Sequence, residues 1–227
     1  LVGSEMCIRD REDWERRADE IRSELKRVCI EIESKGLAEC RQTDITSHRI
    51  EMTDNKPIRH KVRPVPYHCR KEFEQIIKDQ LQAGIIRPST SATCSPVNLV
   101  LKEDGSLRLT IDYRKVNNAT LPDPYPLPRI DDIIARLAKN KFFSKIDLAN
   151  GYYQIKMHKD SIKFTTFISE FGKHEYLAMP MGLKNAGSTF QRMMDKVLDG
   201  LIGEICYVYL DDIIIFSEDL EGHEGRV

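Results

Sequence analysis

Two adjacent aspartates interrupt an apolar stretch near the end of the chain. Asp211 and Asp212 lie between residues 205–210 and 213–216, and both flanking runs have the composition of buried β-strands. Adjacent carboxylates repel each other and resist desolvation. A protein keeps such a pair at an exposed turn, where aspartate is common, or beside a cation that neutralises it. The pair alone leaves both explanations open.

A third aspartate, Asp147, ends another apolar run, residues 142–146. If the two runs are neighbours in a sheet, their backbones lie about 4.8 Å apart and the carboxylates share one small volume. Oxygen ligands of this kind suit Mg²⁺, and two ions about 3.5–4 Å apart can activate a hydroxyl nucleophile. The sequence therefore predicts Asp147, Asp211 and Asp212 as catalytic metal ligands for two Mg²⁺ ions, or Mn²⁺ in their place. Asp147 and Asp211 would bridge the ions, and Asp212 would have a lesser role.

Composition indicates an ordinary soluble globular protein. The chain has 227 residues, of which 41% are hydrophobic and 31% charged. No window approaches the roughly 20 apolar residues of a membrane span, and the N-terminus lacks the apolar core of a secretory signal. The 6 cysteines show no metal-ligand spacing, which favours reduced thiols in an intracellular protein.

Charge is informative locally rather than globally. The net charge of −1 argues mildly against a nucleic-acid binder. Residues 56–71, however, contain no acid and six cations, which fits either a solvated basic loop or an edge that contacts phosphates. The six cations are Lys56, Arg59, Lys61, Arg63, Arg70 and Lys71.

The N-terminal part of the chain differs from the rest. Residues 1–11 have no periodicity and look like an artefactual leader. Residues 11–35 have apolar positions at alternating steps of four and three, which predicts a helix ending at Gly36 and lying on the domain surface or pairing with another helix. Residues 39–65 are polar and proline-punctuated, so we expect an extended arm.

The remaining pattern alternates helices with short strands, which predicts an α+β sheet covered by helices on one face. Asp104-Gly105 is a strong hairpin signal, residues 121–128 predict an extended connector, and Ser188 to Gln191 matches a capping box that would open a helix. Helices are expected over residues 70–83, from Pro128 through Ile130, Ile133, Ile134 and Leu137, and from 188 through Phe190, Met193, Met194, Val197 and Leu198; strands are expected over residues 97–102, 107–113, 142–146, 155–157, 164–168, 205–210 and 213–216.

Several motifs, in order and spacing, resemble those of reverse transcriptases. Tyr209-Leu210-Asp211-Asp212 is similar to their Tyr-x-Asp-Asp box, and residues 143–152 look like their first catalytic-aspartate motif. Residues 107–117 look like the strand that meets the incoming nucleotide. Residues 125–134 and 179–194 resemble segments of gypsy-type LTR retrotransposon enzymes, and the match runs from about residue 43 to 217.

This resemblance implies a right-hand polymerase of α+β class, with a ferredoxin-like palm sheet that has helices on one face. It implies synthesis of DNA on RNA or DNA templates from deoxynucleoside triphosphates, in the cytoplasm or in a retrotransposon particle. The expected domains are a leader (1–11), a helical extension (12–42) and a reverse transcriptase domain (43–227), with fingers over about 43–122 and 155–179 and palm over about 123–154 and 180–227.

The resemblance also assigns further site residues. Leu148 would lend a backbone carbonyl to a metal ion, and Tyr209 would contact the template and primer. Lys102 and Arg108 would grip the triphosphate, as cationic clamping of a charged leaving group requires. Tyr152 would exclude a 2′-hydroxyl, and an ordinary core tyrosine is the alternative. Met181 and Gly182 would line the nucleotide pocket.

Some features depart from the family pattern. Gly187 replaces a usual proline, which loosens the start of the following helix, and Met181 replaces phenylalanine or glutamine. Asn150-Gly151 has hairpin propensity, whereas the family has a short helical turn there, and we expect the helical turn. The chain ends at Val227 before any thumb or RNase H segment, so we expect a piece of a longer polyprotein.

Three activities compete for such a fragment. The first is DNA synthesis by a polymerase domain. The second is nucleic-acid binding by a truncated, non-catalytic remnant of such a domain. An RNA-copying RNA polymerase is disfavoured by Tyr209 and Tyr152, since those enzymes tend to have Gly-Asp-Asp and a small or polar residue at the sugar.

Overall fold

The computed structural model describes residues 15–24, 26–27, 37, 41–54, 56–148 and 150–227. The leader expected over residues 1–11 lies outside this part. Of the helix expected over residues 11–35, residues 15–24 and 26–27 are helical, and its expected end at Gly36 lies outside the described residues.

The chain forms two compact units, each assembled from separate stretches of sequence. The first contains residues 1–34, 128–147 and 200–227, and the second contains residues 35–127 and 148–199. The three predicted catalytic aspartates belong to the first unit. The five residues expected to bind the nucleotide belong to the second.

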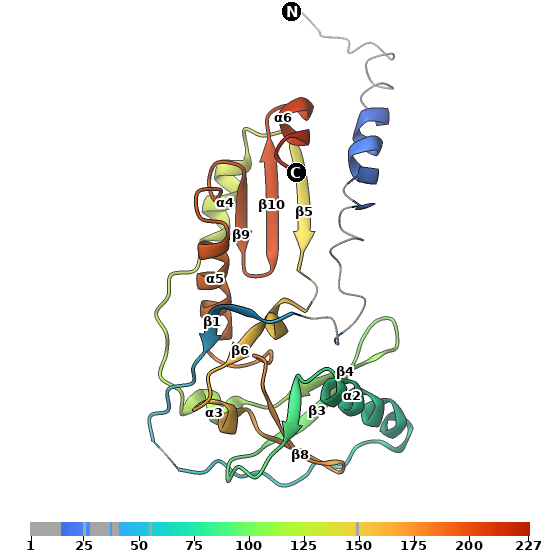
Figure 1. Cartoon of the computed structure of the whole chain (residues 1–227), viewed down its shortest axis with the longest axis vertical. Helices are drawn as coiled ribbons and strands as arrows, with labels where there is room; N and C mark the ends of the chain where they lie inside the picture. Colours follow the sequence, from blue (N-terminus) through green and yellow to red (C-terminus); the bar gives the residue numbers. More distant parts are fainter. Residues whose placement is uncertain (1–14, 25, 28–36, 38–40, 55, 149) are drawn as a thin grey trace, which may run out of the picture. The chain divides into compact units, whose positions relative to one another are not determined.

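The first unit is built on a three-stranded antiparallel sheet in the order β5-β10-β9 (Figure 1). The strands are β5 (Phe142–Asp147), β9 (Cys206–Tyr209) and β10 (Asp212–Ser217), which confirms the three expected strands to within one residue at each end. Cys206, Val208 and Ile215 are buried on one face of this sheet. Phe216 is buried on the opposite face, where its ring stacks on that of Tyr207 with the ring centroids 5.2 Å apart. Because β10 is central, both of its edges are hydrogen-bonded.

Two short helices belong to the same unit, α4 (Ile130–Leu137) and α6 (Leu220–Glu224). Asp219 caps α6 by accepting a hydrogen bond from the Gly222 N–H at 2.6 Å. The apolar positions of α4 are unevenly buried. Ile133 is 8% exposed, whereas Ile130 and Ile134 are 52% and 60% exposed, so a helical apolar pattern did not ensure burial here.

The second unit contains a five-stranded sheet in the order β2-β8-β7-β3-β4. Strands β3 and β7 are parallel, and the other neighbours are antiparallel. The expected hairpin at Asp104-Gly105 closes β3 onto β4, with Gly105 at a φ of 82° that favours glycine. The bounds are β2 (Ile86–Pro88), β3 (Ser95–Leu101), β4 (Leu107–Ile111), β7 (Phe167–Ser169) and β8 (Gly172–Tyr176).

Helix α2 (Arg70–Gln82) packs against this sheet through its buried Phe73 and Ile77 (Figure 1). Its bounds confirm the helix expected over residues 70–83. Glu72 in its first turn accepts a hydrogen bond from the Leu107 N–H at 2.7 Å, which ties the helix to β4. The 3-10 helix η2 (Tyr67–Cys69) precedes it.

The extended arm adds a strand of its own. Strand β1 (Thr43–His48) pairs in parallel with β6 (Ile155–Met157) (Figure 1). The His48 Nδ1 atom lies 2.8 Å from Thr189 Oγ1 on helix α5 (Ala186–Val197), so the arm is fastened to that helix. The remaining elements of this unit are α3 (Arg114–Asn118), η3 (Gly151–Gln154) and η4 (Ile162–Thr165).

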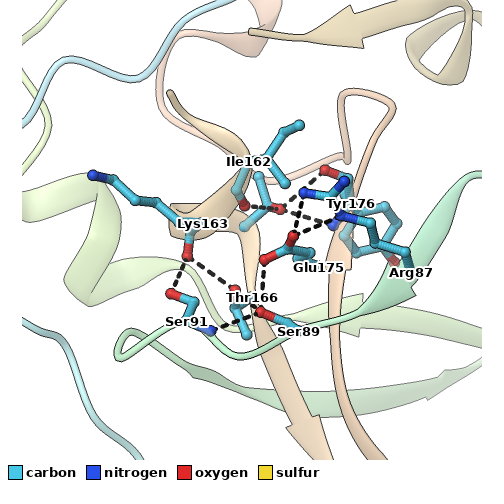
Figure 2. A network of polar contacts seen from close by, with 9 residues as sticks. Arg87, Ser89, Ser91, Ile162, Lys163, Thr166, Glu175 and Tyr176 are labelled. Carbon is cyan, nitrogen blue, oxygen red and sulfur yellow. Dashed lines mark hydrogen bonds and ion pairs between the residues drawn. The ribbon is translucent and has the colours of Figure 1, made fainter. Parts of the chain in front are cut away.

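A polar network joins three segments of the second unit (Figure 2). The buried Glu175 on β8 accepts a hydrogen bond from Arg87 Nε at 2.8 Å and another from Ser89 Oγ at 2.6 Å. Ser89 Oγ in turn lies 3.1 Å from Thr166 Oγ1. Both oxygens of a buried carboxylate are thereby satisfied, as burial requires.

Three local expectations can be compared with the structure. The strand expected over residues 164–168 was wrong in part, because residues 162–165 form η4 and only Phe167–Ser169 is strand. The capping box was also wrong, because α5 already begins at Ala186, before the expected cap at Ser188. The helical turn expected at Asn150-Gly151 is confirmed, with Asn150 at a φ of 53° and η3 following it.

Candidate active site

The three predicted catalytic aspartates lie at one end of the sheet in the first unit. Asp147 ends β5, Asp212 begins β10, and the two residues are direct partners in the antiparallel register. Directly opposed residues point to the same face, with Cβ atoms about 4.5–5.5 Å apart. Asp211 occupies the turn that precedes Asp212. The expectation that the two strands are sheet neighbours is thus confirmed.

The register opposes Asp147 to Asp212 rather than to Asp211. The expected division of labour, in which Asp147 and Asp211 bridge the ions and Asp212 has the lesser role, therefore stays a prediction. Asp147 is exposed, and Asp211 and Asp212 are half-buried.

The turn between β9 and β10 holds the backbone in an unusual conformation. Tyr209 and Asp212 are register partners, so the turn consists of Leu210 and Asp211 alone. Leu210 has a φ of 56°, as the first position of a type II′ hairpin turn requires. For a non-glycine residue this conformation costs about 1–2 kcal/mol. The turn thus fixes the direction in which the two aspartates leave the hairpin.

A lysine on the same face supplies positive charge to this end of the sheet. Lys145 lies two residues before Asp147 on β5, and its Nζ is 2.9 Å from Asp212 Oδ1. The Asp212 carboxylate, and to a smaller extent those of Asp147 and Asp211, raise the pKa of Lys145. Lys145 was not among the residues predicted from the sequence. Its position two residues before Asp147 on a strand, and so on the same face, could have indicated it.

The donor set at this end of the sheet fits a divalent cation by its chemistry, since carboxylate oxygens are the ligands that Mg²⁺ prefers. Within the described residues, no group of three or more His, Cys, Asp or Glu side chains is arranged to hold a metal ion. The Leu148 carbonyl, the other expected ligand, accepts a hydrogen bond from the Gly151 N–H at 3.2 Å.

The five residues expected to bind a nucleotide line one cavity of about 460 Å³ in the second unit. Lys102 and Arg108 come from the β3–β4 hairpin, Tyr152 from η3, and Met181 and Gly182 from the loop before α5. The two cations are exposed, and Met181 is 55% exposed. Positions far apart in the sequence therefore form one surface with cationic, aromatic and backbone groups.

The packing of Tyr152 explains its orientation. Its ring stacks on Phe190 of α5, with the ring centroids 4.9 Å apart and the planes at 12°. A Cβ atom on the preceding Gly151 would lie 2.9 Å from Phe190 Cζ, so only glycine fits there. Gly151 and Phe190 thus hold Tyr152 as part of the cavity wall.

The cavity also contains residues that the sequence analysis missed. Gln80, Tyr153 and Tyr176 line it, and Gln80 lies 3.4 Å from Tyr153 Oη and 3.5 Å from Tyr176 Oη. Gln80 and Tyr176 are nearly inaccessible to solvent, and burial raises the pKa of Tyr176 well above its usual value. No motif marks these residues, because their proximity arises only when α2, η3 and β8 fold together.

Tyr209 and Gly187, two other positions predicted from the sequence, each lie in a regular element. Tyr209 is the last residue of β9 and is half-buried. Gly187 is the second residue of α5, where its substitution for proline did not prevent the helix from starting at Ala186. Across the described part of the chain, no helix has the length and apolar character of a membrane span.

Comparison with known proteins identifies the chain. The family described as "Reverse transcriptase (RNA-dependent DNA polymerase)" matches residues 100–227, more than half of the sequence. The chain belongs to the reverse transcriptase family. The resemblance carried by its motifs is thereby confirmed.

The curated proteins that resemble this reverse transcriptase include Pol polyproteins of transposons. The chain is 44% identical over 190 residues to the retrovirus-related Pol polyprotein from transposon 297 of Drosophila melanogaster, a match that covers 82% of the chain and 18% of that protein. It is 44% identical to the Pol polyprotein from transposon gypsy of the same organism, over 78% of the chain and 18% of that protein. The chain thus spans about a fifth of the length of these relatives.

Solved structures confirm the α+β fingers-and-palm fold of the reverse transcriptase. The protease-reverse transcriptase of prototype foamy virus superposes with a TM-score of 0.79 at 24% identity, covering 92% of this chain and 28% of that one. A foamy viral protease-reverse transcriptase in complex with double-stranded DNA gives a TM-score of 0.75 at 27% identity, over 83% and 33% of the two chains.

Proposed function

We propose that this chain catalyses template-directed DNA synthesis, adding deoxynucleotides to the 3′-hydroxyl of a primer on an RNA or DNA template. The observation that carries the proposal is the register of β5 and β10, which opposes Asp212 to Asp147 beside Asp211 in a chain of this family. Related foamy viral enzymes have been solved with double-stranded DNA and with an RNA/DNA hybrid, which supports the proposed template and primer.

In this reaction the carboxylates of Asp147, Asp211 and Asp212, with the Leu148 carbonyl, would hold two divalent cations, Mg²⁺ or Mn²⁺. Bound there, such ions lower the pKa of the attacking hydroxyl and stabilise the charge on the departing pyrophosphate. Lys145 neutralises part of the carboxylate charge through its contact with Asp212.

The cavity of the second unit would hold the deoxynucleoside triphosphate. Lys102 and Arg108 are cationic and exposed on the β3–β4 hairpin, which suits them to bind the phosphates. Tyr152, held by Phe190, would occupy the volume that a 2′-hydroxyl needs, and Met181 and Gly182 would support the base and sugar. Tyr209 would contact the template and primer.

The proposal extends to organisation and surroundings. The fingers would comprise about residues 43–122 and 155–179, and the palm about 123–154 and 180–227. As in the Pol polyproteins it resembles, the chain would work together with further polyprotein segments, inside the cell or in a retrotransposon particle.

Primer extension tests the proposal. The chain is given a primed RNA template, deoxynucleotides and Mg²⁺, and the parent is compared with Asp211→Asn, which keeps the size of the side chain and removes its charge. We expect incorporation by the parent and a loss of at least about 100-fold in the variant, as for other groups that stabilise transition-state charge. Equal incorporation by both proteins would refute the proposal.

A non-catalytic nucleic-acid-binding role is the second candidate. It is favoured by the basic run at residues 56–71, which contains six cations and no acid and therefore suits contacts with phosphates. It predicts salt-sensitive binding of a primed template without any templated extension. Detecting extension that requires Asp211 would exclude it.

A further inference from the structure

The side chain of Asn117 makes two hydrogen bonds to one loop. Asn117 is in α3, its Nδ2 donates to the Gly182 carbonyl at 2.8 Å, and its Oδ1 accepts from the Lys184 N–H at 2.9 Å. An amide is the one short side chain that offers a donor and an acceptor in fixed relation. The two bonds therefore fix the orientation of the amide and hold the Gly182 carbonyl and the Lys184 N–H at a set distance from α3.

The loop held by Asn117 forms part of the nucleotide cavity. Met181 and Gly182 line that cavity, and Gly182 also lines a second hollow of about 420 Å³ that contains Asn117 itself. Asn117 thus lines the second hollow and is not among the residues that line the nucleotide cavity. The Gly182 backbone has a φ of 90°, a conformation that few other residues adopt, and a Cβ there would lie 3.8 Å from Tyr113.

The segment that carries Asn117 is firmly packed. Val116 beside it is fully buried, and the Asn117 N–H donates to the Tyr113 carbonyl at 2.7 Å. Tyr113 is itself buried, with its hydroxyl donating to the Thr165 carbonyl at 2.8 Å. A displacement of the Asn117 amide would therefore disturb a packed segment.

Later parts of the loop have separate attachments. Lys184 Nζ donates to the Thr120 carbonyl at 2.8 Å, and Asn185 Nδ2 donates to the Leu121 carbonyl at 2.7 Å. These two bonds are made by residues that follow Gly182 in the chain. Removal of the Asn117 amide would leave them in place while releasing the Met181–Gly182 portion.

We propose that Asn117 is a positioning residue that sets the affinity for the incoming nucleotide by fixing the Met181–Gly182 wall of the cavity. The inference rests on the proposed function of that cavity. Asn117 acts through the Gly182 carbonyl and the Lys184 N–H and does not itself contact the nucleotide. Its effect should appear in nucleotide binding rather than in the chemical step.

The test compares Asn117→Ala and Asn117→Asp with Asn118→Ala, a matched control at the exposed asparagine that follows it. The Asn117→Asp variant separates the two bonds, because a carboxylate can still accept from the Lys184 N–H but cannot donate to the Gly182 carbonyl. Single-nucleotide extension gives KM and kcat, fluorescence titration with a labelled deoxynucleotide gives Kd, and thermal unfolding gives Tm.

For Asn117→Ala we expect KM and Kd to rise about tenfold, the effect of losing two hydrogen bonds, with kcat changed less than about threefold. Asn117→Asp, which keeps only the bond from the Lys184 N–H, should weaken binding less than Asn117→Ala but measurably, and Asn118→Ala should match the parent. A fall in Tm with unchanged KM and Kd would overturn the proposal, as would parental affinity in Asn117→Asp.

The titration that gives Kd distinguishes a failure of this inference from a failure of the proposed function. If the parent binds the nucleotide without extending a primer, the polymerase proposal fails while Kd still decides the role of Asn117. If the parent neither binds nor extends, both proposals are overturned.

Discussion

At the scale of single residues, His48 shows how burial controls the charge state of a side chain. His48 is 1% exposed, and burial lowers its pKa from 6.5 to about 4, although Asp123 partly opposes the change. A lowered pKa in the folded state means that folding excludes a proton. The stabilisation is complete above pH 6.5 and is lost as the pH falls from 6.5 towards about 4.

We therefore predict that the free energy of unfolding falls by about 3 kcal/mol over this pH window on account of His48, at roughly 1.4 kcal/mol per pH unit. Urea unfolding of the parent and of His48→Gln measures it, because glutamine can still bond to Thr189 but does not titrate. The difference between the two pH profiles isolates His48 from the other histidines. Parallel profiles would contradict the prediction.

Sequence alone could identify the residues that break a local pattern. Asp147, Asp211 and Asp212 stood out because charges at the ends of apolar strands are costly and need a reason. Asn117, Gln80 and Lys145 stayed hidden. Asn117 and Gln80 act across gaps of dozens of residues, and Lys145 becomes relevant only once the register of β5 and β10 is known.

At the scale of elements, the Arg87–Glu175 pair attaches β2 to β8 asymmetrically. The Glu175 side chain is 9% exposed, whereas that of Arg87 is 54% exposed. Removing the arginine leaves a buried carboxylate with Ser89 as its remaining partner in Figure 2. Removing the carboxylate charge leaves an arginine that water can solvate.

We predict that Arg87→Met destabilises the second unit by about 2 kcal/mol or more, and that Glu175→Gln costs less. Urea unfolding of the two variants at neutral pH gives the comparison. Gln75→Ala, on the exposed side of α2, serves as a control with an expected change below about 0.5 kcal/mol. The opposite ranking would show that the ion pair, rather than the buried carboxylate, determines the cost.

Helices and strands could be predicted from the sequence where no tertiary contact opposed the local sequence signal. The β3–β4 hairpin followed from Asp104-Gly105, and β9 and β10 followed from uninterrupted apolar runs. The start of α5 was misplaced, because the helix begins at Ala186 after Asn185 and the expected cap Ser188 lies inside it. The hairpin propensity of Asn150-Gly151 was overridden by tertiary structure, since Gly151 packs closely against Phe190.

At the scale of the whole molecule, the basic run at residues 56–71 is only partly neutralised. Three of its cations form ion pairs with acids elsewhere in the chain: Lys56, Arg63 and Arg70. Within the described residues, Arg59, Lys61 and Lys71 form no such pair. These last three cations are therefore the ones available to phosphates in a chain whose net charge is −1.

Neutralising Arg59, Lys61 and Lys71 to glutamine should weaken binding of an RNA/DNA hybrid and reduce its dependence on salt. The slope of log affinity against log salt should fall by up to about 0.9 for each phosphate that the variant no longer binds. Fluorescence anisotropy at several salt concentrations between about 50 and 200 mM measures the slope. Lys139, Lys141 and Lys159 changed to glutamine form the control, and an equal effect in both triple variants would indicate that the run has no special role.

The central position of β10 also determines which sequence changes this chain can tolerate. Its residues pair with β5 on one edge and β9 on the other, so one inserted residue within Asp212–Ser217 would shift two ladders at once and turn every following side chain to the other face. Copies of a mobile element that acquire an insertion there should lose the fold of the first unit, whereas substitutions that keep the length preserve the register of both ladders.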